Sequence, residues 1–339
     1  MDATPITTRP DLMARLRSNG PLTVAAAVLA LLVLAAELSG SRILVSLLAQ
    51  AAIISILALG VGMLGRSLNL ISFGHAAPFG VGAYGAAYVL SSGVTAPEIG
   101  LLLMLVLVFA SFFLIGLVAS RLEGIAFSML TLALGQAAYV AISKFRDVTG
   151  GADGMIVATP RRLFGIPAST FQDPHGMLLL GVAVMGLVYA GLRALERSKL
   201  GELTVAIREN EERVQFLGYR TRAVKAGVFA LSASTAALSG ALFALYQGFI
   251  SPEIMHWSFS GSALIMMILG GTSFLWGPIA GAFGYFLLRE GLSDLTSHWM
   301  AVLGVTLIMV TVAWPSGLSG AFSALLQRLD RAHRSGPKS

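Results

Sequence analysis

Long apolar runs separated by short polar segments dominate this chain of 339 residues. A helix needs about 20 consecutive apolar residues to cross the hydrocarbon core of a bilayer. Runs close to that length recur along the sequence, and each one predicts a membrane-spanning helix. The predicted spans are 21–38, 43–64, 73–92, 99–119, 125–142, 176–193, 226–247 and 296–314.

One further apolar stretch, 259–288, is interrupted between Gly270 and Pro278 by the sequence GGTSFLWGP. Gly-Gly and Pro stop helices, and each half of the stretch is about 12–14 residues, which is short for a crossing. We therefore expect a broken or re-entrant helix pair, buried in protein or lining a cavity. The predicted fold is an all-α polytopic membrane protein with about eight transmembrane helices plus this pair.

The composition agrees with a membrane protein, because 56% of the residues are hydrophobic and only 12% are charged. A soluble domain has about 25% charged residues. The chain contains no cysteine, which excludes a disulfide framework, a Cys-based metal site and a thiol nucleophile. The net charge is +6, but the sequence has no patch of mixed basic and aromatic residues that would indicate a nucleic-acid partner. We therefore interpret the basic residues as determinants of membrane topology and as lipid contacts.

The positions of Lys and Arg predict the orientation of the chain. With the N-terminus inside and 259–288 returning to the side from which it enters, 17 of the 23 basic residues lie on inside segments. This asymmetry follows the positive-inside rule and places both termini in the cytoplasm. The expected organisation is a cytoplasmic segment 1–20, a transmembrane region 21–315 with an extracytoplasmic loop 144–175 and a cytoplasmic loop 194–225, and a basic cytoplasmic tail 316–339.

The turn-rich loop 144–175 is long enough to form a docking surface, although a simple connector remains the alternative. The charged segment 199–225 is more specific. Its apolar residues fall at helical spacing, Asn210 is placed to cap a second helix, and Gly218 is placed to end it. Two short amphipathic helices are therefore expected under the membrane, and the apolar residues at helical spacing are Leu203, Ala206, Ile207, Val214 and Leu217.

Two interpretations of these helices remain open, a membrane-surface helix and a protein-docking element. Glu202, Glu209, Glu211 and Glu212 argue against the first, because acidic groups repel anionic headgroups. The next span carries small residues on one face, which lets helices approach closely. These residues are Ser232, Ala236, Gly240 and Ala244.

The segment ENEERVQFLGYRTRAVKAGVFALSASTAALSGALFALYQGFISP resembles the cytoplasmic loop and following helix of LivM-type permease subunits of branched-chain amino acid ABC importers. SLNLISFGHAAPFGVGAYGA (67–86) and MILGGTSFLWGPIAGA (267–282) look like two further motifs of that family. The resemblance covers roughly 45–325. Glu212 and Gly218 keep the spacing of the loop by which such permeases grip their ATPases, whereas Arg213 and Val214 stand where the family has alanines.

The resemblance implies a permease of the bacterial inner membrane that is not itself an enzyme and imports branched-chain amino acids or a related small polar or amphipathic solute. The implied partners are a second, LivH-type permease subunit, two ABC ATPase subunits and an extracytoplasmic substrate-binding protein. The chain lacks the phosphate-binding pattern GxxxxGK[ST], so ATP and Mg²⁺ are expected on the ATPases, with no cofactor or metal on this chain. The expected ATPase-contacting residues are Arg208, Glu209, Glu212, Arg213 and Gly218.

Residues around the Gly- and Pro-interrupted segments are candidates for the translocation path, because paired interruptions in transporters mark such paths. The motifs GAYG (82–85) and GAFG (281–284) each follow a Ser-Phe pair and a Pro, as an internal repeat or by chance. His75 is either a functional group at membrane depth or, with Ser72, only a helix cap. The candidates are Ser72, His75, Pro78, Gly82, Tyr84, Gly270, Gly271, Thr272, Trp276 and Gly277.

An ion-coupled secondary transporter is the alternative function, and it usually needs carboxylates at membrane depth. The acidic residues near the predicted spans all lie at their ends, which counts against ion coupling: Glu37, Glu98, Glu123 and Glu290. An intramembrane zinc protease would need HExxH on a helix. The five His residues are scattered, which counts against this class as well.

Overall fold

The computed structural model describes residues 40–92, 96–163 and 165–293, together with residue 298 and the short stretches 301–302, 304–306, 308–309 and 317–320. The predicted span 21–38, most of 296–314 and nearly all of both terminal segments lie outside the described residues. Within the described residues, five helices are long and apolar enough to cross a membrane. They are α2 (Arg42–Leu68), α4 (Pro97–Ala119), α5 (Gly124–Lys144), α8 (Pro174–Glu196) and α11 (Thr221–Gln247).

Shorter elements connect these five helices and complete the bundle. The predicted span 73–92 is shorter than expected, because helix α3 begins only at Ala76 and has 16 residues. Between residues 42 and 293 the other described helices are α3 (Ala76–Ser91), α6 (Arg146–Thr149), η1 (Gly151–Asp153), α7 (Ser169–Gln172), α9 (Lys199–Glu209), α10 (Glu211–Phe216), η2 (Pro252–Met255), α12 (Trp257–Gly270) and α13 (Gly277–Ser293). Four two-residue strands are β1 (Met155–Ile156), β2 (Arg162–Leu163), β3 (Ile166–Pro167) and β4 (Phe249–Ile250).

Helices α2 and α11 form the centre of the bundle. In each of them 78% of the membrane-spanning window is buried, compared with 17% in α4 and α5 and 22% in α8. Helix α2 packs against α8, α11, α12 and α13, and α11 packs also against α3 and α4. The outer helices leave large apolar side chains such as Ile99, Leu114 and Leu187 exposed, as lipid contact requires.

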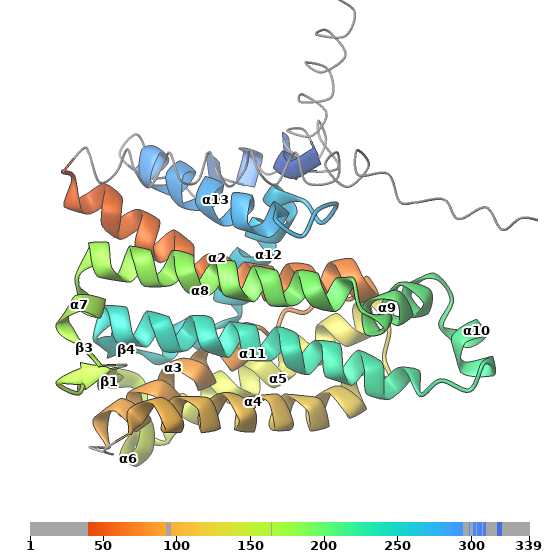
Figure 1. Cartoon of the computed structure of the whole chain (residues 1–339), viewed down its shortest axis with the longest axis horizontal. Helices are drawn as coiled ribbons and strands as arrows, with labels where there is room; N and C mark the ends of the chain where they lie inside the picture. The colour runs from red at the N-terminus through yellow and green to blue at the C-terminus, as the bar shows by residue number, and fades with distance from the viewer. Residues whose placement is uncertain are drawn as a thin grey trace, which may run out of the picture.

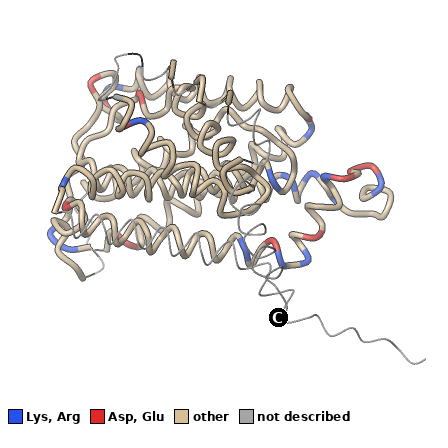
Figure 2. Tube along the Cα trace, turned by 90° about the horizontal axis from the view of Figure 1, so that it is seen from above, with Lys and Arg blue, Asp and Glu red and all other residues tan. Residues whose placement is uncertain are grey.

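The two ends of the bundle differ in structure (Figure 1). Helices α9 and α10 project from one end, which we call the α10 end. The strands, α6 and α7 lie at the other, which we call the strand end, where β1 pairs with β4 in antiparallel register, Met155 opposite Ile250. Charged residues gather at the two ends, and the length of the bundle between them carries few (Figure 2). This distribution fits an apolar slab around the middle of the helices.

The predicted broken pair is confirmed as a hairpin of α12 and α13. Helix α12 ends at Gly270, the chain reverses through 271–276, and α13 begins at Gly277, directly before Pro278. Gly271 has φ +83°, a conformation that favours glycine. Helix α13 has 17 residues, more than the 12–14 expected, and reaches the strand end (Figure 1). The reversal itself lies at the α10 end.

The predicted small-residue face of α11 is confirmed, because Ser232, Ala236, Gly240 and Ala244 are all buried. A Cβ atom added to Gly240 would lie 1.9 Å from the carbonyl oxygen of Phe79 in α3. In the reverse direction, a Cβ on Gly82 of α3 would lie 2.0 Å from the carbonyl oxygen of Ala237. The backbones of α3 and α11 therefore touch directly, as in other membrane helix pairs that pack through small residues.

Candidate functional site at the α9–α10 segment

The charged segment folds into the two short helices that the sequence predicts. Ser198 caps α9 through its Oγ, which accepts a hydrogen bond from the Gly201 amide at 3.4 Å. Asn210 separates the helices, and its Oδ1 accepts from the Arg213 amide at 2.8 Å, the expected cap of α10. Helix α10 ends after six residues at Phe216, and Gly218 follows with φ +86°. The cap and the glycine stop are both confirmed.

We expect Asn210→Ala to loosen α10 specifically. Loss of a side-chain cap costs about 1 kcal/mol, so amide hydrogen exchange across 211–216 should accelerate about fivefold. Asn210→Asp, which keeps an acceptor oxygen, is the matched control and should exchange at the wild-type rate. Hydrogen exchange followed by mass spectrometry in detergent measures both. Equal exchange in Asn210→Ala and in the wild type would show that the cap does not hold α10.

A buried lysine attaches α10 to the bundle. Lys225, in the first turns of α11, is only 5% exposed, and its Nζ lies 2.6 Å from Glu211 Oε2 and 3.9 Å from Glu123 Oε1. Burial raises the pKa of Glu211, but hydrogen bonds from Lys225 and Thr221 and the charge of Lys225 outweigh this effect, so the pKa lies below its ordinary value of 4.5. The ion pair therefore fixes the first turn of α10 to the start of α11.

Acidification should release this attachment. A carboxyl group whose pKa is lowered by folding stabilises the fold above its ordinary pKa, and the stabilisation disappears as the pH falls through the lowered value. Exchange protection of 211–216 should therefore be constant above pH 4.5 and decline below it. Lys225→Met should weaken the segment by about 2 kcal/mol at neutral pH, the value of a charged hydrogen bond. The variant should also lose this pH dependence; an unchanged acid response in Lys225→Met would contradict the pairing.

The outward surface of α10 carries an exposed apolar group that the charge pattern did not predict. Phe216, Leu217 and Tyr219 are 83%, 72% and 54% exposed, and we call these three residues the α10 tip. Of the two apolar residues at helical spacing here, Val214 is buried and Leu217 is exposed. Leu217 follows the last helical residue, Phe216, so it does not continue the buried face on which Val214 lies. The signal in the sequence was the run FLGY, in which apolar residues flank the glycine stop.

The five residues predicted to contact an ATPase do not all lie together. Glu209, Glu212, Arg213 and Gly218 are exposed on or beside α10, next to the α10 tip. Arg208 instead turns toward the bundle, where its Nη1 donates to the backbone oxygen of Arg66 at 2.6 Å. The structure therefore divides the predicted set into an outward group of four and one residue that holds α9 to the end of α2.

Arg66 joins four elements at the α10 end. Its Nε lies 2.8 Å from Glu196 Oε1 at the end of α8. Its Nη1 donates to the backbone oxygens of Thr272, at 3.0 Å, and of Ser273, both in the reversal between α12 and α13. A cavity of about 780 Å³ borders these groups and α9. No local pattern in the sequence reveals these contacts of Arg66, because its partners lie 130 and 206 residues away.

The predicted path residues near α3 pack against the central helix α11. His75 is 1% exposed, and its Nε2 lies 2.7 Å from Ser232 Oγ of α11. Ser232 donates its own hydroxyl proton to the backbone oxygen of Gly60 at 2.6 Å, so Nε2 of His75 is the donor to Ser232. His75 makes no side-chain cap bond, whereas Ser72 Oγ accepts from the Gly74 amide at 3.2 Å. Gly74 precedes α3, so neither of the two proposed caps, His75 or Ser72, caps this helix through its side chain.

The path candidates from Gly270 to Gly277 form a second group, at the hairpin reversal. Gly270 and Gly277 face each other so closely that a Cβ on Gly270 would lie 1.9 Å from the Gly277 oxygen. Trp276 is 7% exposed and stacks on Phe274. Pro78, Gly82 and the buried Tyr84 belong to α3. Helix α2 contacts the neighbours of both groups, with Gly60 against Ser232, the partner of His75, and Gly62 against Pro278 of α13.

A family model described as "Branched-chain amino acid transport system / permease component" matches residues 43–311, which include α2 to α13. The chain belongs to this family. The protein "High-affinity branched-chain amino acid transport system permease protein LivM" is 28% identical over 288 residues in Escherichia coli (strain K12) and in Salmonella typhimurium, covering 78% of this chain and 67% of each relative. The "Autoinducer 2 import system permease protein LsrC" of Escherichia coli (strain K12 / DH10B) is 28% identical over 189 residues, 52% of each chain. No solved structure matches.

In this permease the loop 144–175 is folded. It contains α6, η1, β1, β2, β3 and α7, and Arg146 Nη2 lies 2.5 Å from Asp153 Oδ2. The β1–β4 pair places Ile156 opposite Phe249, and both side chains are exposed, at 77% and 47%. The loop therefore presents an ordered surface with apolar groups, and its role as a docking surface stays a prediction.

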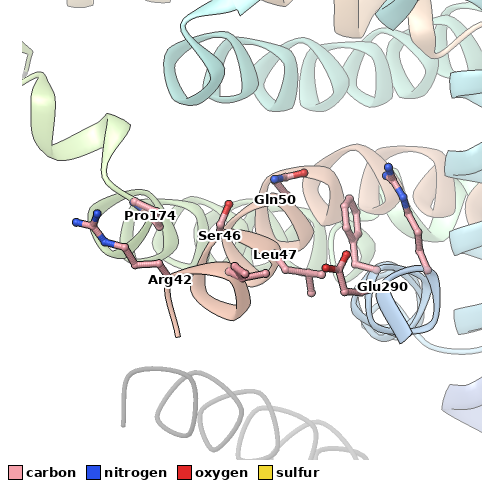
Figure 3. Close-up of a pocket in the computed structure, with 9 residues that line it drawn as sticks. Arg42, Ser46, Leu47, Gln50, Pro174 and Glu290 are labelled. Carbon is pink, nitrogen blue, oxygen red and sulfur yellow. The ribbon is translucent and has the colours of Figure 1, made fainter. Parts of the chain in front are cut away.

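Two further cavities of the permease lie away from the α9–α10 segment. One of about 490 Å³ lies at the strand end, with Arg42 and Pro174 at one side, Glu290 at the other, and Ser46 and Gln50 of α2 between them (Figure 3). The other, about 700 Å³, lies among α3, α4 and α5 and is lined mainly by apolar side chains. Neither cavity contains the predicted path residues His75 or Trp276.

Proposed function

We propose that this permease is a transmembrane subunit of an ATP-binding cassette importer and that the α10 tip seats in a groove of an ATPase subunit. The observation that carries the proposal is the α10 tip itself. Three neighbouring apolar side chains project into solvent at and just after the end of a helix that Asn210 caps and the Lys225–Glu211 pair fixes. A short, rigid helix with exposed apolar anchors suits docking into a groove of a partner protein.

The chemistry of the segment supports a protein partner rather than lipid alone. Exposed Glu209 and Glu212 lie beside the α10 tip and would be repelled by anionic headgroups. The chain itself has no GxxxxGK[ST] sequence, so ATP and Mg²⁺ would be bound by the ATPase subunits and the energy would arrive through α10. In this proposal the α10 end is cytoplasmic, and so are both chain termini, in agreement with the distribution of Lys and Arg.

For the imported solute we propose branched-chain amino acids or a related small polar or amphipathic compound. Support comes from the family description and from the LivM relatives, which are named for branched-chain amino acid transport. The LsrC relatives are named for autoinducer 2 import, so the family includes more than one solute. The proposed assembly adds a second, LivH-type permease, two ATPases and an extracytoplasmic binding protein, which would deliver the solute at the strand end.

Co-purification from the native host tests the proposal. An affinity-tagged permease should retain an ATPase, and the complex in liposomes should take up radiolabelled leucine only when ATP, Mg²⁺ and the binding protein are supplied. Uptake that continues without ATP and stops when the ion gradient is abolished would instead indicate an ion-coupled secondary transporter. Uptake of other solutes through the same ATP-driven complex would keep the importer and replace only the substrate.

A further inference from the structure

We infer that Arg66 is a positioning residue that transmits movement of the α9–α10 segment to the reversal of the α12–α13 hairpin. The inference rests on the proposed function, because it assigns a route for force that enters at α10. Arg66 contacts the hairpin through its side chain and the α9–α10 segment through its backbone oxygen. One residue therefore connects the surface that would receive the force to a broken helix pair in the bundle.

The hairpin side of this connection depends on unpaired backbone groups. Backbone carbonyl groups of a non-helical segment have no helical donor and need another hydrogen-bond partner. Helix α12 ends at Gly270, and the following residues 271–276 are not helical, so the Thr272 and Ser273 oxygens are available to a donor. The Arg66 guanidinium donates to both. A planar guanidinium with several fixed N–H groups can hold two such acceptors and a carboxylate together, which an ammonium group does less well.

The segment side of the connection has two attachments. Glu196, the last residue of α8, pairs with Arg66 and is separated from α9 by only Arg197 and Ser198. Gly201 of α9 packs so closely on α8 that a Cβ there would lie 2.3 Å from the Glu196 oxygen. Arg208, near the end of α9, holds the Arg66 backbone oxygen at 2.6 Å. A displacement of α9 must therefore either carry Arg66 with it or break these bonds.

A cavity of about 780 Å³ between α9 and the hairpin reversal makes the Arg66 bonds important for transmitting movement. Arg66, Arg208, Thr272 and Ser273 all line it, together with Val205 on the exposed side of α9. Because empty space separates much of α9 from the hairpin reversal, direct packing transmits less displacement there than it does in a filled core. The Arg66 bonds cross the edge of this space and, beside the packing of α2 on α9, α12 and α13, they join α9 to the hairpin reversal.

Reconstituted complexes carrying Arg66→Ala, Arg66→Lys or Glu196→Gln test the inference. We expect Arg66→Ala to assemble with the ATPase within twofold of wild type and to keep basal ATP hydrolysis, but to lose at least tenfold in solute uptake per ATP hydrolysed. Arg66→Lys should recover part of the lost uptake per ATP. The uptake per ATP of Glu196→Gln should lie between the values of Arg66→Lys and wild type. Arg197→Ala is the matched control, because this exposed arginine lines the same cavity beside Glu196. It should behave as wild type.

A distance measurement separates transmission from a merely structural role. The chain has no cysteine, so spin labels can be placed singly at Val205 and Thr272, whose side chains are exposed. With Arg66 present, the separation of the labels should stay constant between nucleotide-free and vanadate-trapped complexes. In Arg66→Ala it should change between the two states. The inference would be overturned if the label separation stayed constant between the two states in Arg66→Ala as well, and if this variant had wild-type uptake per ATP. Wild-type complexes without ATP-dependent uptake would overturn the proposed function and this inference with it.

Discussion

Gly240→Leu is expected to prevent the permease from folding correctly in the membrane. The first carbon of the new side chain would lie 1.9 Å from the Phe79 oxygen and 3.0 Å from the Ala83 amide nitrogen. Both are backbone atoms of α3, so no rotamer change relieves the clash and the two helices must separate. Overpacking typically costs about 1–3 kcal/mol, and we expect more than 3 kcal/mol here because a whole helix interface opens.

Gly227→Leu provides the matched control for this prediction. It places the same substitution in the same helix, at a glycine whose added Cβ would meet nothing within 4 Å. Size-exclusion chromatography and thermal unfolding in detergent should show a monodisperse Gly227→Leu protein close to wild type. The Gly240→Leu protein should be aggregated or strongly destabilised. Similar behaviour of the two variants would mean that the α3–α11 contact is less close than described.

The double substitution Phe216→Asp and Leu217→Asp should abolish ATPase association. Both side chains are largely exposed in the isolated chain, so removing them should not lower the stability of the permease. In the complex they would be buried anchors, and anchors of this kind dominate binding energy. We expect retention of the ATPase in a pull-down, and ATP-driven uptake, to fall more than a hundredfold, with the melting temperature of the permease unchanged.

Leu200→Asp controls for the general effect of an added acid on this segment. Leu200 is 49% exposed and lies on α9, away from the α10 tip. The Leu200→Asp protein should retain the ATPase to within about threefold of wild type, because substitutions outside the central anchors have small effects on binding. Retention of the ATPase by the Phe216→Asp/Leu217→Asp protein would move the contact away from the α10 tip and would leave the docking role without its main support.

Local signals in the sequence predicted the local features of the fold. Asn210 and Gly218 set the limits of α10 through a cap and a glycine stop, which depend only on neighbouring residues. The Gly-Gly and Gly-Pro pairs likewise located the break between α12 and α13. The small-residue face of α11 was visible in its spacing, although its partner, α3, was not. These predictions succeeded because the physical cause lies within about ten residues of the effect.

The features that the sequence did not predict depend on contacts between distant segments. The joining role of Arg66 needs Glu196 and Thr272, and the attachment of α10 needs Lys225 to be buried at the start of α11. His75 was placed near a helix start correctly, but its bond to Ser232 spans 157 residues. Periodicity gives the face of a helix, whereas the identity of the facing helix follows only from the packing of the whole bundle.

The central position of α2 has a consequence for how the protein is made. Helix α2 ends at Leu68, but its neighbour α11 is complete only at Gln247. At a synthesis rate of about 5–20 residues per second, roughly 180 residues of delay correspond to about 9–36 s. During that time Gly60 and Gly62 of α2 have neither Ser232 nor Pro278 against them. The half of the permease that is synthesised first is therefore an incomplete bundle in the bilayer. Its packing is completed only after the later helices have been synthesised.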